Sequence, residues 1–227
     1  MLELVIIPWD LFPLAAAEEA AIVDDAFKLL MILGAPVFAF VVVTVVYSML
    51  RFRRKGEPAG DGPAVHGPRP VILAWLAVTG ALTLLVIITP GITGLRELRA
   101  HANEAPDLVV QVQGVRWMWQ ATYPEHGVVS YDELVLPEGE RVRFEVTSID
   151  VLHSFWVPAF RAKIDAVPGK VTTTFATPDT LGSFQQDVNM RIQCAELCGL
   201  GHSVMRLPVR VVTEEEFEAW ISKRSAK

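Results

Sequence analysis

Two long runs without a charged residue constrain the fold of this 227-residue chain more than any other feature. They extend from Leu29 to Leu50 and from Pro70 to Leu95. Each exceeds the roughly 20 apolar residues that an α-helix needs to cross a bilayer, and a helix satisfies its own backbone hydrogen bonds in lipid. The sequence therefore predicts a transmembrane hairpin at residues 27–96, with spans at about 29–50 and 70–95. The alternative is a pair of core helices in a soluble protein, although such helices usually carry a polar face.

The distribution of charge around the two runs predicts their orientation. Basic residues lie at the two ends of the linker, residues 51–69. They are Arg51, Arg53, Arg54, Lys55 and Arg69. The positive-inside rule therefore places the linker in the cytoplasm and both termini outside the plasma membrane. Residues 1–26 form an external N-terminal segment in this reading. Met1–Leu14 lacks the basic start of a signal peptide, but Ala15–Ala17 could imitate a cleavage site, so removal of a short leader stays open.

The remaining residues, 97–227, form a predicted external β domain. After a connector at Arg96–Pro106, apolar residues recur with period two, and Pro–Gly turns separate the segments. This pattern is typical of an all-β Greek-key sandwich or barrel. The expected strands are Leu108–Val115, Trp117–Tyr123, Arg141–Thr147, Val171–Ala176, Arg191–Cys194 and Arg206–Val212.

The C-terminal segment has the pattern of a short helix. Thr213 can cap it, and Glu216 stands at the third helical position, as in a capping box. Phe217 and Trp220 then share one face that can pack on the sheet. The formal net charge of the chain is −6, which argues against non-specific binding of nucleic acid.

One loop concentrates the metal-binding chemistry of the sequence. The stretch Cys194-Ala-Glu-Leu-Cys198-Gly-Leu-Gly-His202-Ser-Val-Met205 places two thiols, an imidazole and a thioether within twelve residues. A second imidazole, His153, follows a candidate strand earlier in the chain. Thiolate, thioether and imidazole ligands together select copper over hard cations. The glycines between Cys198 and His202 let the loop turn tightly around a bound ion.

The number of cysteines distinguishes a mononuclear copper site from a dinuclear one. A single type 1 copper needs one Cys, two His and a weak axial Met, whereas two thiolates can bridge two copper ions with one imidazole on each. Met205 and the carbonyl of Glu196 would then be weak outer ligands. Three other readings stay open at this stage: a structural zinc ion bound by two Cys and two His, a Cys194–Cys198 disulfide, and separate structural roles for His153 and Met205.

Several stretches resemble subunit II of the cytochrome c oxidases. Cys194–Met205 looks like the family's CuA loop, and Asp150–Pro158 resembles the segment that supplies its first histidine. Lys163–Gly169 is similar to the stretch that follows, and Gln113–Trp119 resembles the aromatic box at the electron entry point. Phe12–Ala17 looks like the family's approach to the first span. The resemblance covers nearly the whole chain and implies a cupredoxin-like fold for the β domain.

The resemblance implies a role for each matching position. Cys194 and Cys198 would bridge two copper ions, His153 and His202 would be terminal ligands, and Met205 would be axial. Glu196 would bind copper through its carbonyl, and its side chain would reach a magnesium or manganese ion shared with subunit I. Trp117 would be the electron entry residue. The acidic residues near the site would help to dock a basic cytochrome c, and they include Asp132, Asp150 and Asp165.

The implied function is electron entry into a terminal respiratory oxidase. The chain would accept electrons from cytochrome c or a small copper protein and pass them to haem in subunit I, where O2 is reduced to water with proton pumping; subunit III would be a further partner. A CuA-type nitric oxide reductase and a membrane-tethered copper carrier or assembly protein are the alternatives. The family often has a glutamate at the start of the second span, but Pro70–Trp75 has no acid. Either Glu57 or Asp61 replaces it, or this proton route is missing.

Overall fold

The structure is a computed structural model that describes residues 13–53, 56 and 67–225. These residues form two units: a helical unit at Asp24–Glu97, and a β unit made of the rest of the described chain. Glu57 and Asp61, the two acids considered for a proton route, lie outside the described residues, as do most of the linker and residues 1–12. The predicted domain boundaries at 26/27 and 96/97 stay predictions.

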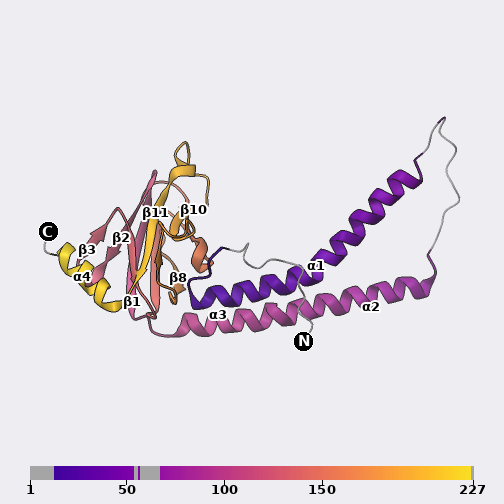
Figure 1. Cartoon of the computed structure of the whole chain (residues 1–227), viewed down its shortest axis with the longest axis horizontal. Coiled ribbons are helices and arrows are strands. Elements are labelled where there is room, and N and C mark those ends of the chain that lie inside the picture. Colours follow the sequence, from indigo (N-terminus) through magenta and orange to yellow (C-terminus); the bar gives the residue numbers. More distant parts are fainter. Residues whose placement is uncertain (1–12, 54–55, 57–66, 226–227) are drawn as a thin grey trace. The chain divides into compact units, whose positions relative to one another are not determined.

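Helix α1 (Glu18–Arg51) and the helical segment that begins with α2 (Arg69–Val86) contain the two apolar runs (Figure 1). The most apolar window of each has no residue buried by the rest of the described chain. A core helix of a soluble protein would be covered on most sides, so the core-helix alternative does not fit. Apolar side chains without protein cover require another apolar medium, and the length of both helices suits a bilayer.

The second span is interrupted, which the sequence analysis did not anticipate. After α2 the chain forms a π-helical turn, η2 (Ile87–Ile92), in which Thr89 has φ −131° and ψ 114°. Thr89 precedes Pro90, and a proline both lacks the N–H for a helical hydrogen bond and pushes the preceding residue out of the α region. Helix α3 (Thr93–Asn103) then continues through most of the expected connector.

The β unit is an all-β sandwich of two sheets, as the sequence predicts. The first sheet has the order β3 (Val128–Ser130), β2 (Met118–Tyr123), β1 (Leu108–Val115), β5 (Val142–Ser148) and β8 (Thr172–Ala176). The second has the order β4 (Leu134–Pro137), β11 (Arg206–Val212), β10 (Arg191–Cys194), β6 (His153–Val157) and β7 (Ala162–Ala166), with β9 (Gly182–Ser183) paired to β11. The chain passes repeatedly between the sheets, as in a Greek-key fold.

Alternating side chains of the two sheets form the core. Buried and partly exposed residues alternate along β5, because successive strand side chains point to opposite faces. Phe144 of β5 meets Phe155 of β6 with ring centroids 5.1 Å apart, which joins the two sheets. Both side chains are fully buried. This contact places β6, and therefore the segment that begins with His153, firmly against the first sheet.

The C-terminal helix α4 (Glu214–Ser225) packs as expected. The hydroxyl of Thr213 accepts a hydrogen bond from the backbone N–H of Glu216 at 3.4 Å, which caps the helix. Phe217 and Trp220 are buried, and both rings contact Tyr123 of β2. Figure 1 shows α4 beside β3 at the end of the β unit.

The segment before α1 is bound to the β unit. The Ala16 N–H donates to the Ala159 carbonyl at 2.9 Å. The buried carboxylate of Glu19 accepts hydrogen bonds from the backbone N–H and the hydroxyl of Thr177 at 2.8 and 3.1 Å. Arg161 also donates to backbone carbonyls of this segment. Within the described residues, the predicted N-terminal segment therefore packs as part of the β unit as far as Val23.

A carboxyl cluster makes the stability of the β unit dependent on pH. Burial, a hydrogen bond with Glu214 and the charges of Glu214, Asp107 and Glu218 raise the pKa of Glu140 to about 7. The folded chain therefore binds a proton that the unfolded chain has lost above its ordinary pKa of 4.5. The stabilising contribution is complete below that value and is lost as the pH rises through about 7.

We predict that Glu140→Gln raises the thermal unfolding temperature at pH 8 and changes it little at pH 5. The neutral amide removes a repulsion worth about 1 kcal/mol once solvent screening is allowed for. Differential scanning calorimetry of the full chain at the two pH values measures this difference. Glu138→Gln is the matched control, because Glu138 lies exposed in the same turn. An equal gain at both pH values for Glu140→Gln would contradict the prediction.

Candidate metal centre

Strand pairing brings together ligands that are far apart in the sequence. His153 is the first residue of β6, and Cys194 is the last residue of β10. These strands are antiparallel neighbours, with Cys194 opposite Phe155. The loop that follows Cys194 closes at the start of β11, where the Cys194 N–H donates to the Met205 carbonyl at 3.0 Å. The loop that the sequence singled out therefore folds back over the histidine.

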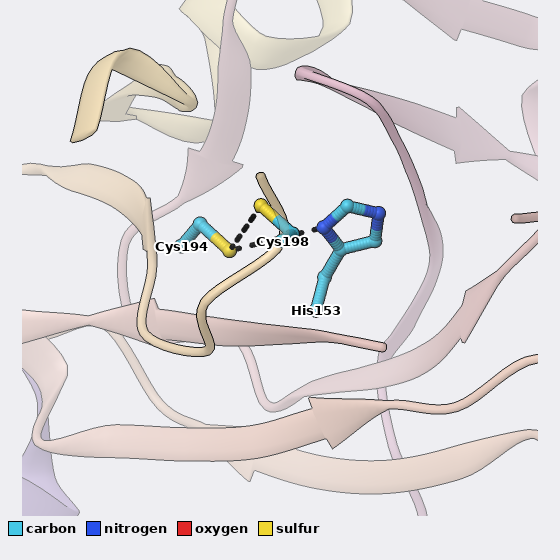
Figure 2. A group of neighbouring side chains, drawn as sticks. All are labelled: His153, Cys194 and Cys198. Atoms are coloured by element: carbon cyan, nitrogen blue, oxygen red, sulfur yellow. Dashed lines mark hydrogen bonds between the residues drawn. The ribbon is translucent and has the colours of Figure 1, made fainter. Parts of the chain in front are cut away.

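Each thiol of the loop has its own imidazole. The two sulfur atoms, Cys194 Sγ and Cys198 Sγ, are 3.8 Å apart. His153 Nδ1 lies 3.9 Å from Cys194 Sγ, and His202 Nδ1 lies 3.7 Å from Cys198 Sγ. In Figure 2, dashed lines join the Cys194 thiol to the Cys198 thiol and to the near nitrogen of His153. Both cysteines are free, so the disulfide reading does not describe this structure.

The two weaker candidate ligands complete the same cluster. The Met205 sulfur lies 3.9 Å from Cys198 Sγ. The carbonyl oxygen of Glu196 lies 3.2 Å from Cys194 Sγ. His153 and Met205 are fully buried, and Cys194 and Cys198 are only 3% and 6% exposed. The six residues that the sequence proposed as ligands are therefore brought together, largely away from solvent.

The donor atoms form two thiol–imidazole pairs, Cys194 with His153 and Cys198 with His202. Among the described residues, the ligand atoms of His153, Cys194 and Cys198 all lie within 4.8 Å of one another, and His202 is not a member of that set. A tetrahedral zinc site would need all four ligands around one ion. Two thiols shared between two imidazoles instead offer each ion its own terminal nitrogen. The soft sulfur atoms favour copper for such a pair.

Binding of a metal ion at this position would have to displace the proton of the Cys198 thiol. Burial, a hydrogen bond with Cys194 and the charge of Cys194 raise the pKa of the Cys198 thiol to about 11. A thiol with this pKa keeps its proton at neutral pH. Metal binding through the Cys198 sulfur is therefore coupled to release of a proton, so the affinity for a metal ion would rise with pH.

Trp117 lies on the backbone of the metal-binding loop. Its indole Nε1 donates a hydrogen bond to the Cys198 carbonyl at 3.1 Å. A Cβ at Gly201 would lie 2.4 Å from Trp117 Cδ2, so only glycine leaves room for the ring. Gly199 has φ +111°, a conformation that favours glycine. Both glycines help the loop to turn. At Gly201, the close approach of the indole is the stronger reason why the position requires glycine.

Asp150 contacts the ring nitrogen of His153 that faces away from the thiols. Its Oδ1 lies 2.9 Å from Nε2 of His153, and its Oδ2 accepts hydrogen bonds from the backbone N–H and the Nε of Arg116. Burial alone would raise the pKa of the Asp150 carboxyl, but the hydrogen bonds from Arg116, His153 and Val151 outweigh it and hold the pKa well below its usual range. The carboxylate is therefore ionised beside the ring.

The three acids proposed for donor docking have different surroundings. Asp150 belongs to the metal centre, and its side chain is only 17% exposed. Asp132 pairs with Arg224 of α4 at 2.6 Å. Asp165 lies exposed on β7, opposite Ser154 of β6. Sequence reasoning missed the contact between Asp150 and His153, although an acid three residues before a ligand histidine is a usable signal.

The fold and the site together define a class: a cupredoxin-like β domain with a copper-type ligand cluster, attached to two apolar helices. Comparisons with known proteins agree. The family model for the periplasmic domain of cytochrome c oxidase subunit II matches residues 131–212. Cytochrome c oxidase subunit 2 of Thermostichus vulcanus is 31% identical, over 95% of this chain and 79% of that protein. A probable cytochrome c oxidase subunit 2 of Rickettsia bellii is 30% identical, over 86% of this chain and 77% of that protein.

A solved structure supports the same assignment for the β domain. The periplasmic domain of cytochrome oxidase subunit II from Bradyrhizobium japonicum superposes with a TM-score of 0.50 at 30% identity, covering 54% of this chain and 96% of that chain. The chain belongs to the cytochrome c oxidase subunit II family, which confirms the resemblance read from its sequence and the cupredoxin-like fold. With its two apolar helices, it is a membrane protein with an external domain.

We predict that Gly201→Ala displaces the indole of Trp117 and destabilises the metal-free chain by about 1–3 kcal/mol, the usual cost of overpacking. The unfolding temperature measures this loss. In a Trp117→Ala background the same substitution should cost much less, because the clash has been removed. Gly182→Ala is the control, since its Cβ would meet no atom closer than 3.8 Å. Equal costs for Gly201→Ala in both backgrounds would refute the assigned contact.

Proposed function

We propose that this chain is the electron-entry subunit of a terminal respiratory oxidase of the cytochrome c oxidase class. It accepts single electrons from cytochrome c or a small copper protein. The electrons then reach haem in subunit I, where O2 is reduced to water and protons are pumped. Subunits I and III are its partners in the plasma membrane, and both termini lie outside with the copper domain. This organisation corresponds to an external segment at 1–26, a hairpin at 27–96 and a copper domain at 97–227.

One observation carries this proposal: two free thiols lie 3.8 Å apart, and each has an imidazole nitrogen within 4 Å. His153, Cys194, Glu196, Cys198, His202 and Met205 would hold two copper ions. Such a pair supplies a one-electron acceptor whose charge is shared between two metals. The protein contributes a buried and braced ligand set, which limits movement of the ligands when an electron arrives.

Trp117 provides a route from the surface to the ligand loop. The residue is 40% exposed, and its indole is hydrogen-bonded to the backbone of Cys198. Exposed apolar side chains lie close to it in the chain or in the loop that it contacts, including Met118 and Leu200. A donor that covers Trp117 would therefore also bury apolar surface.

The burial of the ligands favours electron transfer over copper delivery. A carrier must release its ion, but the cysteines, His153 and Met205 are almost inaccessible to solvent. A CuA-type nitric oxide reductase would use the same input site with a different catalytic subunit. The carboxylate of Glu196, which is partly exposed, would bind the magnesium or manganese ion at the contact with subunit I.

We predict two copper ions per full-length chain and an EPR signal from one electron shared equally by both. Metal analysis and EPR of the purified protein measure these quantities. Cys198→Ser should abolish the shared signal, because one of the two thiols that would hold the copper pair is lost. Zinc in place of copper, or a single copper released rapidly to a chelator, would reject the proposal and favour a structural zinc site or a carrier. Oxidation of the donor with NO, but not O2, as the terminal substrate would identify a nitric oxide reductase.

We predict that Trp117→Phe slows oxidation of reduced cytochrome c several-fold in the assembled oxidase while both copper ions are retained. The phenyl ring loses the hydrogen bond to the Cys198 carbonyl and covers less of the loop. Stopped-flow spectroscopy measures the rate. Trp220→Phe is the matched control, because it also removes an indole hydrogen bond: Trp220 of α4 donates to the Glu133 carboxylate at 2.8 Å. An unchanged rate in Trp117→Phe would remove this residue from the entry route.

A further inference from the structure

Exposed apolar side chains adjoin Trp117. Met118 follows it in the chain, and Leu200 stands between Gly199 and Gly201, the two glycines that lie beside the indole. Leu200 is 98% exposed, the highest value among the large apolar side chains of the described residues. Clustered apolar side chains that are this open to water mark interaction sites in soluble domains.

The loop adds two further apolar side chains to this surface. Leu197 is exposed and directly precedes Cys198, whose carbonyl accepts the hydrogen bond from the indole. Val204 is also exposed, and its backbone N–H donates to the Gly201 carbonyl at 3.2 Å. Both residues are therefore held close to the part of the loop on which the indole lies.

The connection between β5 and β6 supplies one more member. The backbone N–H of Ile149 donates at 3.2 Å to the carbonyl of Gly114, three residues before Trp117, and the Ile149 side chain is exposed. Three separate segments thus form one surface around the indole, which we call the apolar face. It consists of Trp117, Met118, Ile149, Leu197, Leu200 and Val204.

The apolar face has little net charge around it. The segments that form it are residues 114–118, 148–152 and 194–205, and their charged side chains are Arg116, Asp150 and Glu196. Arg116 and Asp150 form an ion pair at 3.0 Å, and Glu196 is only partly exposed. On the neighbouring strands, Arg206 begins β11 and Asp165 lies exposed near the end of β7, one charge of each sign. A ring of lysines on a donor would therefore find no matching ring of acids here.

The carboxyl cluster of Glu140, Asp107, Glu214 and Glu218 lies at the other end of the sandwich. β1 and β5 begin beside this cluster and end beside the apolar face, and β11 runs in the reverse direction. β5 has seven residues, which corresponds to about 20 Å. The Debye length is only about 8 Å at physiological ionic strength. The cluster therefore attracts cations to its own end of the domain and contributes little at the apolar face.

We propose that the apolar face is the docking site of a cytochrome c whose haem edge is surrounded by uncharged apolar side chains. Removal of apolar surface from water, and not charge attraction, then holds the two proteins together over Trp117. The interface can be small, as in other short-lived electron-transfer complexes. This inference rests on the proposed electron-entry function, and its donor differs from the basic cytochrome c that the sequence analysis expected.

The first measurement is the rate constant for oxidation of reduced cytochrome c by the assembled oxidase, from low to high salt. Two donors are compared: a cytochrome c with an uncharged haem edge and one with a ring of lysines around it. We expect the uncharged donor to react faster, with a rate constant that changes less than about twofold, because charge attraction would raise the rate at low salt by about tenfold or more.

The second measurement uses variants of Leu200, whose side chain is almost fully exposed, so that its replacement leaves the core intact. Leu200→Ser should raise KM for the uncharged donor several-fold without changing the EPR spectrum of the copper centre. Leu200→Asp should also slow this donor, but it should speed the lysine-ringed donor at low salt and make that rate fall as salt is added. Leu181→Ser is the matched control, because Leu181 is exposed beside Gly182, which pairs with Val211 near the far end of β11. It should behave as the parent oxidase.

Two results would overturn the inference. One is a parent oxidase that prefers the lysine-ringed donor and reacts with it about tenfold more slowly at high salt. The other is an unchanged KM for the uncharged donor in Leu200→Ser. A parent oxidase that lacks the copper pair, or that holds it but oxidises neither donor, would instead show that the proposed function fails.

Discussion

The antiparallel pairing of β6 with β10 is the constraint on which the site depends. It places the first residue of one strand beside the last residue of the other, so that His153 and Cys194 meet across 41 positions of sequence. Phe155 anchors the same pairing in the core through its contact with Phe144 of the opposite sheet. The position of the histidine is therefore set by the packing of the sandwich and not by the loop that carries the cysteines. The loop supplies the other ligands to a nitrogen that is already fixed.

The second half of the site is held by backbone contacts. The loop from Cys194 to Met205 is closed by hydrogen bonds at its base, and the indole of Trp117 lies on its glycines. His153, Met205 and the two cysteines are buried, while the Trp117 ring, which contacts the backbone of the loop, reaches solvent. Burial limits the exchange of ions and the access of water, and the partly exposed ring leaves a contact for an electron donor. The same residue thus serves both the packing of the loop and its connection to the surface.

The features that could be predicted from the sequence are those whose characteristic residues lie close together in the chain. The apolar runs, the longer strands, the capped C-terminal helix and the Cys194–Met205 loop all carry their signals within a few neighbouring residues. The short strands β3, β4, β6, β7 and β9 were missed because they offer too few residues for a periodic pattern. The break at Thr89 had a visible signal in Pro90, but a membrane helix can also tolerate proline, so composition alone could not locate it. Asp150 was read as a surface acid because the residue that covers its second oxygen, Arg116, lies 34 positions earlier in the chain.

The placement of Arg116 and Trp117 links electron entry to the geometry of the ligands. The first residue reaches His153 through Asp150, and the second reaches Cys198 directly. A change at this dipeptide therefore disturbs the metal site and the donor surface together. Rates of donor oxidation alone cannot separate these effects, because a displaced ligand and a lost contact both slow electron entry. The reduction potential and the EPR spectrum respond to the ligands and not to docking, so they assign each residue to one role.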